Sequence, residues 1–164
     1  MSIFRELGIK DGKDRLKEEL LYNLGYCYVK LEKKIADILA PYNLSPVKMN
    51  ALLIIKHVGK DKGLSQAELS KRMIVTAGNV TRLIDRLEKE KLAGRGSLKG
   101  DRRVKVLKIT TKGSDLLDKV WPIYKKKVDD IVSLIPGVDI VSTTVGLSGL
   151  REALTNIETE SVPK

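Results

Sequence analysis

Residues 65–109, SQAELSKRMIVTAGNVTRLIDRLEKEKLAGRGSLKGDRRVKVLKI, predict two short helices followed by a strand pair. Ser65 and Glu68 form the capping-box pattern, in which a hydroxyl and a carboxylate each satisfy a free backbone N–H group. They predict a helix that starts at Gln66 and ends near Met73. A second helix follows Thr76, a possible cap, and its apolar residues fall at i, i+3, i+4 and i+7: Val80, Leu83, Ile84 and Leu87. A brief turn between two such helices indicates a helix-turn-helix.

The opposite face of the second predicted helix is short-chained, polar and basic. It presents Thr76, Ala77, Gly78, Asn79, Thr81 and Arg82, with Asp85 and Arg86 one turn further on. Small residues let a helix lie close to the floor of a groove, while Asn and Thr bond to base edges and Arg reaches phosphate or guanine. The face therefore predicts a DNA-reading helix, although many helix hairpins that bind no DNA share this spacing.

The residues that follow predict a basic β-hairpin. Residues 92–97 and 102–109 fit strands, and residues 98–101 fit the turn between them. Lys99, Arg102 and Arg103 lie at its tip, where they are expected to enter a minor groove, whose negative potential attracts Arg. The predicted fold is mainly α with a small β-hairpin wing: a winged helix-turn-helix core plus long N- and C-terminal dimerisation helices.

The positive charge is concentrated in the middle of the chain. The 164 residues carry a net charge of +10, with 42% hydrophobic and 32% charged residues. Residues 46–113 hold 17 Lys and Arg against 6 Asp and Glu, whereas the remainder holds 14 basic and 15 acidic residues. Such a segment is either a solvated face or a polyanion site. A membrane surface fits less well than nucleic acid, because the apolar residues opposite the basic face are needed for the core.

Long helices are predicted on both sides of this basic segment. Residues 16–40 carry two apolar faces, which suggests that one packs within the chain and the other against a second subunit; a fully buried helix is the alternative. Thr111 can cap a further long helix, and a last helix carries Leu147, Leu150, Leu154 and Ile157 in a narrow seam. We expect one compact domain with three parts: an N-terminal dimerisation helix (1–45), the winged helix-turn-helix (46–113) and C-terminal dimerisation helices (114–164).

Four stretches together resemble the MarR family of transcriptional regulators: GLSQAELS at 63–70, NVTRLIDRLE at 79–88, DRR at 101–103 and ITTKG at 109–113. The resemblance implies a homodimer that inserts a helix into the major groove and a wing into the minor groove of a pseudo-palindromic operator in double-stranded DNA. It also implies a small phenolic or other amphipathic effector. One position departs from the family, because a Gly commonly ends the recognition helix and Lys91 stands there instead, which does not favour a left-handed cap.

The resemblance also assigns roles to individual residues. Ser65 and Gln66 are expected near phosphates, the second helix faces the groove, and Arg102 is the finger at the tip of the wing. Asp101 and Arg103 match an Asp-x-Arg motif whose Asp helps to orient the wing arginine. The candidate DNA-binding residues are Ser65, Gln66, Thr76, Gly78, Asn79, Thr81, Arg82, Arg86, Lys99, Asp101, Arg102 and Arg103.

No arrangement of residues favours an enzyme. The sequence shows no nucleophile–base pair, and its single histidine, His57, and single cysteine, Cys27, leave no metal set, so neither metal nor cofactor is expected. Cys27 is predicted to be a small buried hydrophobe, with redox sensing as the alternative. No apolar run approaches the length of a membrane span and no apolar leader opens the chain, so a cytoplasmic location without membrane contact is expected.

These observations predict a dimeric, sequence-specific DNA-binding transcriptional regulator, with repression as the expected outcome and an effector that modulates DNA affinity. A sequence-independent architectural DNA-binding protein is the alternative. An enzyme that uses the basic cleft for an anionic substrate is the least favoured hypothesis.

Overall fold

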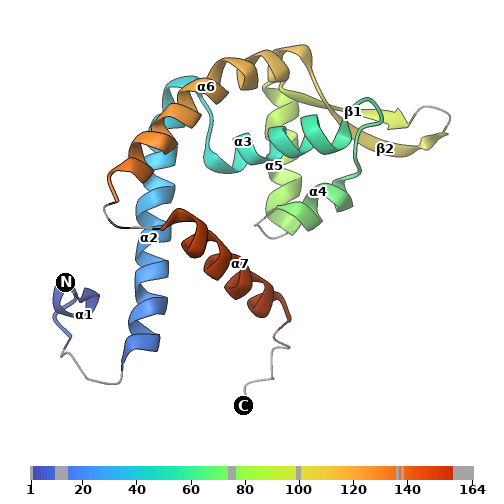
Figure 1. The fold of residues 1–164 in the computed structure, drawn as a ribbon. Helices are drawn as coiled ribbons and strands as arrows, with labels where there is room; N and C mark the ends of the chain where they lie inside the picture. The colour runs from blue at the N-terminus through green and yellow to red at the C-terminus, as the bar shows by residue number, and fades with distance from the viewer. Residues whose placement is uncertain are drawn as a thin grey trace. The chain divides into compact units, whose positions relative to one another are not determined.

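The computed structural model describes residues 2–9, 15–73, 77–98, 101–135, 137 and 139–156, with the backbone alone at 77, 98 and 101–104 (Figure 1). The chain forms two compact units, residues 1–125 and 126–164. The predicted fold class is confirmed, because the chain is mostly helical and carries one two-stranded antiparallel hairpin among the described residues. The division of the chain into three parts by role stays a prediction.

The described elements follow the order that the sequence predicts. A short N-terminal helix precedes the long one, and a 3-10 turn (η1) and a π-helical turn (η2) flank the third helix. The elements are α1 (Ile3–Glu6), α2 (Leu16–Leu39), η1 (Ala40–Tyr42), α3 (Pro46–Ile54), η2 (Ile55–Gly59), α4 (Gln66–Arg72), α5 (Ala77–Lys89), β1 (Ala93–Leu98), β2 (Asp101–Ile109), α6 (Thr111–Ser133) and α7 (Ile140–Asn156).

Side-chain caps fix where three of these helices begin. The Ser65 hydroxyl accepts from the Glu68 N–H at 3.2 Å and the Glu68 carboxylate accepts from the Ser65 N–H at 2.8 Å, so the predicted capping box of α4 is confirmed. Ser45 caps α3 as its position before Pro46 suggests. The predicted cap of α6 is wrong by one residue. The Thr110 hydroxyl, not that of Thr111, accepts a hydrogen bond from the Gly113 N–H at 3.0 Å. The sequence could not separate the two, because both threonines suit a cap and only the point at which β2 ends selects between them.

The end of α5 corrects the expectation at Lys91. Lys91 has a φ of 59° and takes the left-handed conformation that a Gly usually supplies. Its N–H donates to the carbonyl of Glu88 at 2.9 Å, and the N–H of Leu92 donates to the carbonyl of Leu87 at 2.8 Å. These two bonds form a Schellman motif, so the left-handed cap is present despite the lysine.

The hairpin is tied to the loop that precedes α4. β1 and β2 pair antiparallel from Ala93 opposite Ile109, and Leu64 exchanges two backbone hydrogen bonds with Leu107, at 2.8 and 3.1 Å. Gly63 allows this approach, because its φ is +76° and a Cβ there would lie 2.8 Å from the Leu107 carbonyl oxygen. The base of the wing is therefore held by a third extended segment.

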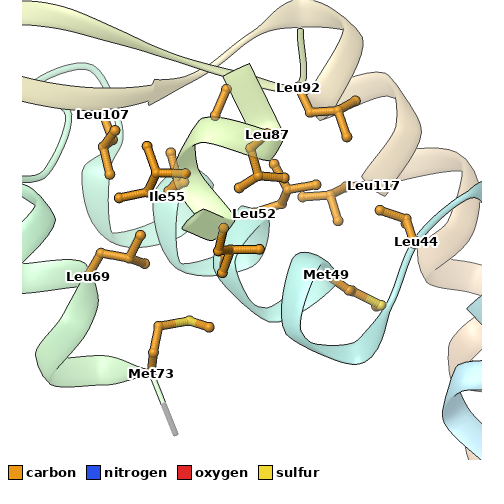
Figure 2. Packing of buried hydrophobic residues seen from close by; sticks show 14 of the residues in the cluster. Leu44, Met49, Leu52, Ile55, Leu69, Met73, Leu87, Leu92, Leu107 and Leu117 are labelled. Atoms are coloured by element: carbon orange, nitrogen blue, oxygen red, sulfur yellow. The ribbon is translucent and has the colours of Figure 1, made fainter. Parts of the chain in front are cut away.

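One hydrophobic cluster joins α3, α4, α5, the hairpin and α6. Figure 2 shows labelled side chains from each of these elements converging, among them Leu52, Leu69, Leu87, Leu107 and Leu117. The four apolar residues predicted for the inner face of the reading helix are all buried: Val80, Leu83, Ile84 and Leu87. The prediction that orients α5 is thereby confirmed.

Helix α2 is mostly exposed in the single chain, which rules out the fully buried alternative. Leu39 is its only buried residue, and Leu20, Tyr26 and Val29 are about half exposed or more. The prediction that Cys27 is buried is wrong for the same reason, because its side chain is exposed. An apolar helix that the rest of residues 1–125 does not cover leaves a large apolar surface to be explained.

Candidate nucleic-acid interface

The predicted reading face of α5 points outward. Every described side chain on it is exposed, because the four buried apolar residues occupy the opposite side of the helix. The exposed residues are Gly78, Asn79, Thr81, Arg82, Asp85 and Arg86. Gly78 has no atom of another element within 4 Å of where a Cβ would be, so the start of the helix is open to a close approach.

The remaining candidates are placed less completely. Ser65 and Gln66 lie at the start of α4, next to the start of α5. Asp101, Arg102 and Arg103 open β2, where only their backbone is described. Thr76 and Lys99 lie outside the described residues. The hairpin projects away from the helices in Figure 1, which puts the start of β2 at its outer end.

A side-chain hydrogen bond joins the starts of the two helices of the motif. The Gln66 amide donates to the Thr81 hydroxyl at 2.8 Å, across exposed surface. Ser65 is already engaged with Glu68 in the capping box. Gln66 and Thr81, which are both predicted to contact DNA, therefore also hold α4 against α5.

A hollow of about 370 Å³ runs along one flank of α5, beside the start of α3. Cationic and polar side chains from both helices line it. The lining residues are Ser45, Val47, Lys48, Asn79, Arg82, Leu83 and Arg86. Lys48 is 6% exposed and is bound by Glu90, with Nζ to carboxylate oxygen distances of 2.6 and 2.7 Å, which leaves Arg82 and Arg86 as the exposed charges of the hollow.

Four of the six acidic residues in the basic segment have structural partners. The Ser65 backbone N–H, and then its hydroxyl, lower the pKa of the Glu68 carboxyl. Glu90 binds Lys48. Asp85 and Glu88 both bind Arg95 of the wing. These four acids are thus engaged within the protein. Most of the described Lys and Arg side chains of the segment have no carboxylate partner among the described residues and can meet an anionic partner.

Arg95 is a residue of this surface that sequence reasoning missed. Its guanidinium contacts Asp85 at 2.8 Å and also Glu88, and its backbone N–H donates to Glu88 at 2.8 Å. The hydrogen bond that the Arg95 guanidinium donates to Asp85 is the main reason that the pKa of Arg95 is raised. Asp85 and Glu88, three residues apart on one helix face, were a partial signal, but the sequence does not show which side of α5 the strand crosses.

Two adjoining apolar pockets lie on the other side of α3. The first, about 220 Å³, is lined by side chains of α2, α3 and α6, including Ile35, Met49, Trp121 and Tyr124. The rings of Trp121 and Tyr124 are 5.7 Å apart and form one wall. The second, about 330 Å³, shares Ile35 with the first and continues along α2 and α3. Their size and lining suit a small apolar molecule.

Two other properties of the described residues bear on function. Within them no group of three His, Cys, Asp or Glu side chains is placed to hold a metal ion. No single described helix has the length and apolar content to cross a bilayer. Residues 16–42 and 46–59 meet that requirement only as a pair, across a bend of 76°.

Comparison with known proteins gives the family of this part of the chain. A model of the MarR family matches residues 42–104, from η1 to the start of β2. The winged-helix region belongs to the MarR family. Proteins of this family are transcription regulators and not enzymes, so the expectation of a non-enzymatic protein is confirmed.

Individual relatives agree with the MarR assignment. The chain is 28% identical over 103 residues to the HTH-type transcriptional regulator MhqR of Bacillus subtilis (strain 168), which covers 63% of this chain and 69% of MhqR. The transcriptional regulator BldR from Sulfolobus solfataricus is 25% identical, with a TM-score of 0.68 over 90% of this chain and all of BldR. The repressor CouR, solved with a 23-mer DNA duplex, shares the fold at 22% identity and a TM-score of 0.71, over 87% of this chain and 99% of CouR.

Proposed function

We propose that this MarR-family protein is a dimeric, sequence-specific, DNA-binding repressor that acts in the cytoplasm on a pseudo-palindromic operator. The observation that carries the proposal is the reading face of α5, which is exposed, basic and short-chained at its start while its apolar side is fully used by the core. A helix of this kind can enter a major groove without unfolding anything else.

Each part of the surface has a proposed role. Gly78, Asn79, Thr81 and Arg82 meet base edges, because they occupy the first turns of the recognition helix. Arg86, Ser65 and Gln66 bind flanking phosphates. Lys99, Arg102 and Arg103 enter the minor groove, with Asp101 orienting the wing arginine. The exposed cations supply affinity, and the base-edge contacts supply sequence preference.

The uncovered apolar surface of α2 supports a homodimer. Leu21, Tyr22, Tyr26 and Val29 line an apolar groove together with Leu7, and all five side chains are between 44% and 61% exposed in the single chain. Monomers seldom leave so many large apolar side chains uncovered. A second copy that covers them also supplies the second recognition helix that a two-fold operator needs.

The apolar pockets beside α3 support control by a small effector. They lie between α2, expected in the dimer interface, and α3, which packs against α5. A molecule that binds there favours conformers in which α2 and the winged helix are differently spaced. Two recognition helices must sit about one helical turn of DNA apart, roughly 34 Å, so a changed spacing weakens binding to both half-sites.

Selection of genomic fragments by the purified protein tests the proposal. A regulator enriches a small set of fragments that share an inverted repeat, and it keeps that preference as salt is raised. An architectural protein, the alternative, binds fragments alike and loses all of them together at elevated salt. Enrichment without any shared repeat would contradict the proposed operator recognition.

A further inference from the structure

Three contacts join the wing to the edge of the recognition helix, and all three involve Arg95. Its guanidinium binds Asp85 at 2.8 Å and Glu88 on the next turn, while its backbone N–H donates to Glu88 at 2.8 Å. Asp85 and Glu88 lie on the flank of α5 opposite the hollow that contains Arg82 and Arg86. The strand is thus fastened by both its backbone and its side chain to one side of the helix.

The position of this cluster argues against a role in general stability. The side chains of Arg95 and Asp85 are 38% and 59% exposed, and exposed ion pairs contribute little to the free energy of folding. The hydrophobic cluster and the bonds between Leu64 and Leu107 already hold the base of the hairpin. Arg95 lies opposite Leu107 in the hairpin, so its contacts act at the same level but on the other strand. They fasten β1 to α5, which constrains the angle of the hairpin to α5.

The charges make the arrangement unusual for a surface that meets DNA. Asp85 and Glu88 border the reading face, where carboxylates repel phosphates. Arg95 compensates one of these charges and is held in place by both. We propose that Arg95, Asp85 and Glu88 form a clip that sets the angle between wing and recognition helix, and that this angle determines operator affinity. The inference rests on the proposed function of the same surface.

If the clip exists, removing the two carboxylates should change operator affinity in opposite directions with and without Arg95. Simple charge repulsion predicts the same direction in both cases. Replacing Asp85→Asn and Glu88→Gln together removes two negative charges near DNA, so repulsion alone predicts tighter binding. The clip predicts binding weaker by about tenfold, because the wing loses its set angle. In a background that already carries Arg95→Gln, the same two substitutions should strengthen binding, since only repulsion then remains.

Two further variants separate positioning from direct phosphate contact. Arg95→Lys keeps the charge but cannot bridge two carboxylates with a planar fork. Its operator affinity should therefore lie between that of Arg95→Gln and that of the parent protein. Full recovery would mean that Arg95 acts as a charge on phosphate. Asp61→Asn is the matched control, because Asp61 is an exposed acid of the same basic segment to which the described residues offer no hydrogen bond or ion pair. It should not weaken binding.

The measurement is operator affinity at several salt concentrations, with thermal unfolding of each variant alongside. Loss of the clip should reduce the salt slope by about one, as expected for one lost phosphate contact of the wing. Unfolding temperatures should stay within about 3 °C of the parent protein. Suppose that the Asp85→Asn, Glu88→Gln variant, which keeps Arg95, binds the operator as tightly as the parent protein or more tightly. That result would overturn the clip.

A second readout needs no DNA. Nitrogen-15 relaxation of β1 and β2 in the free protein should show a rigid hairpin in the parent and larger motion in the Asp85→Asn, Glu88→Gln variant. An equally rigid hairpin in that variant would overturn the clip. If the parent protein prefers no DNA sequence, the proposed function fails, and the relaxation comparison still decides whether the clip exists.

Discussion

Replacing Lys91→Gly should stabilise the protein, although it removes a long side chain and adds the most flexible residue. Lys91 sits at a φ of 59°, and a non-glycine residue in that region bears a steric cost of about 1–2 kcal/mol. Glycine avoids this cost but loses about 0.5–1 kcal/mol more conformational freedom on folding. The midpoints of these two ranges leave a net gain of about 0.75 kcal/mol in the free energy of unfolding.

The backbone bonds around Lys91 do not depend on its side chain. The N–H of Lys91 and the N–H of Leu92 form the Schellman motif, and the Lys91 carbonyl accepts from the Thr110 hydroxyl at 2.7 Å. Glycine can make all of these bonds. The join between α5 and β1 should therefore keep its geometry while its strain is released.

Thermal and denaturant unfolding at one fixed protein concentration measure the effect. A gain of this size corresponds to a rise in Tm of about 1–4 °C for a chain of this length. Lys89→Gly, two residues earlier at the last position of α5, is the matched control and should destabilise by about 0.5–1 kcal/mol. A neutral or destabilising Lys91→Gly would refute the argument that the left-handed position is strained.

Two further predictions concern the wing and the capping box. Arg102→Ala should weaken DNA binding and flatten its salt dependence by about one unit of slope, and an unaltered slope would show that the wing does not reach phosphate. Because hydrogen bonds from Ser65 lower the pKa of Glu68, the ionised carboxylate stabilises the fold at neutral pH, and this contribution is lost as pH falls through the lowered pKa. Compared across an acid titration with Glu68→Gln, the parent protein should lose its advantage in stability only below the ordinary pKa of a glutamate; a constant difference in stability would contradict this reasoning.

Local patterns in the sequence predicted most of the fold. The spacing of Val80, Leu83, Ile84 and Leu87 orients α5 by itself, because helical periodicity fixes which face is buried. The capping box fixes the start of α4 in the same way, through bonds between residues three apart. Where two neighbouring residues suit one role, as Thr110 and Thr111 do, sequence alone could not choose between them.

The errors arose where structure depends on distant segments of the chain or, as we propose for α2, on a second copy. Cys27 was expected to be buried, but the rest of residues 1–125 does not cover that part of α2. Lys91 takes a conformation against its own preference because the turn into β1 demands it. The contacts of Arg95 depend on the direction in which the hairpin leaves α5, and no local pattern encodes that direction.

The central claim is that the exposed side chains at the start of α5 read base pairs. The most direct test measures the affinity of the parent protein and of Asn79→Ala for the selected operator and for every single base-pair substitution of it. The account predicts that Asn79→Ala loses about 1–3 kcal/mol of discrimination at one position in each half-site and keeps the parent preference elsewhere. An unchanged preference at every position would show that this face of α5 does not read the operator.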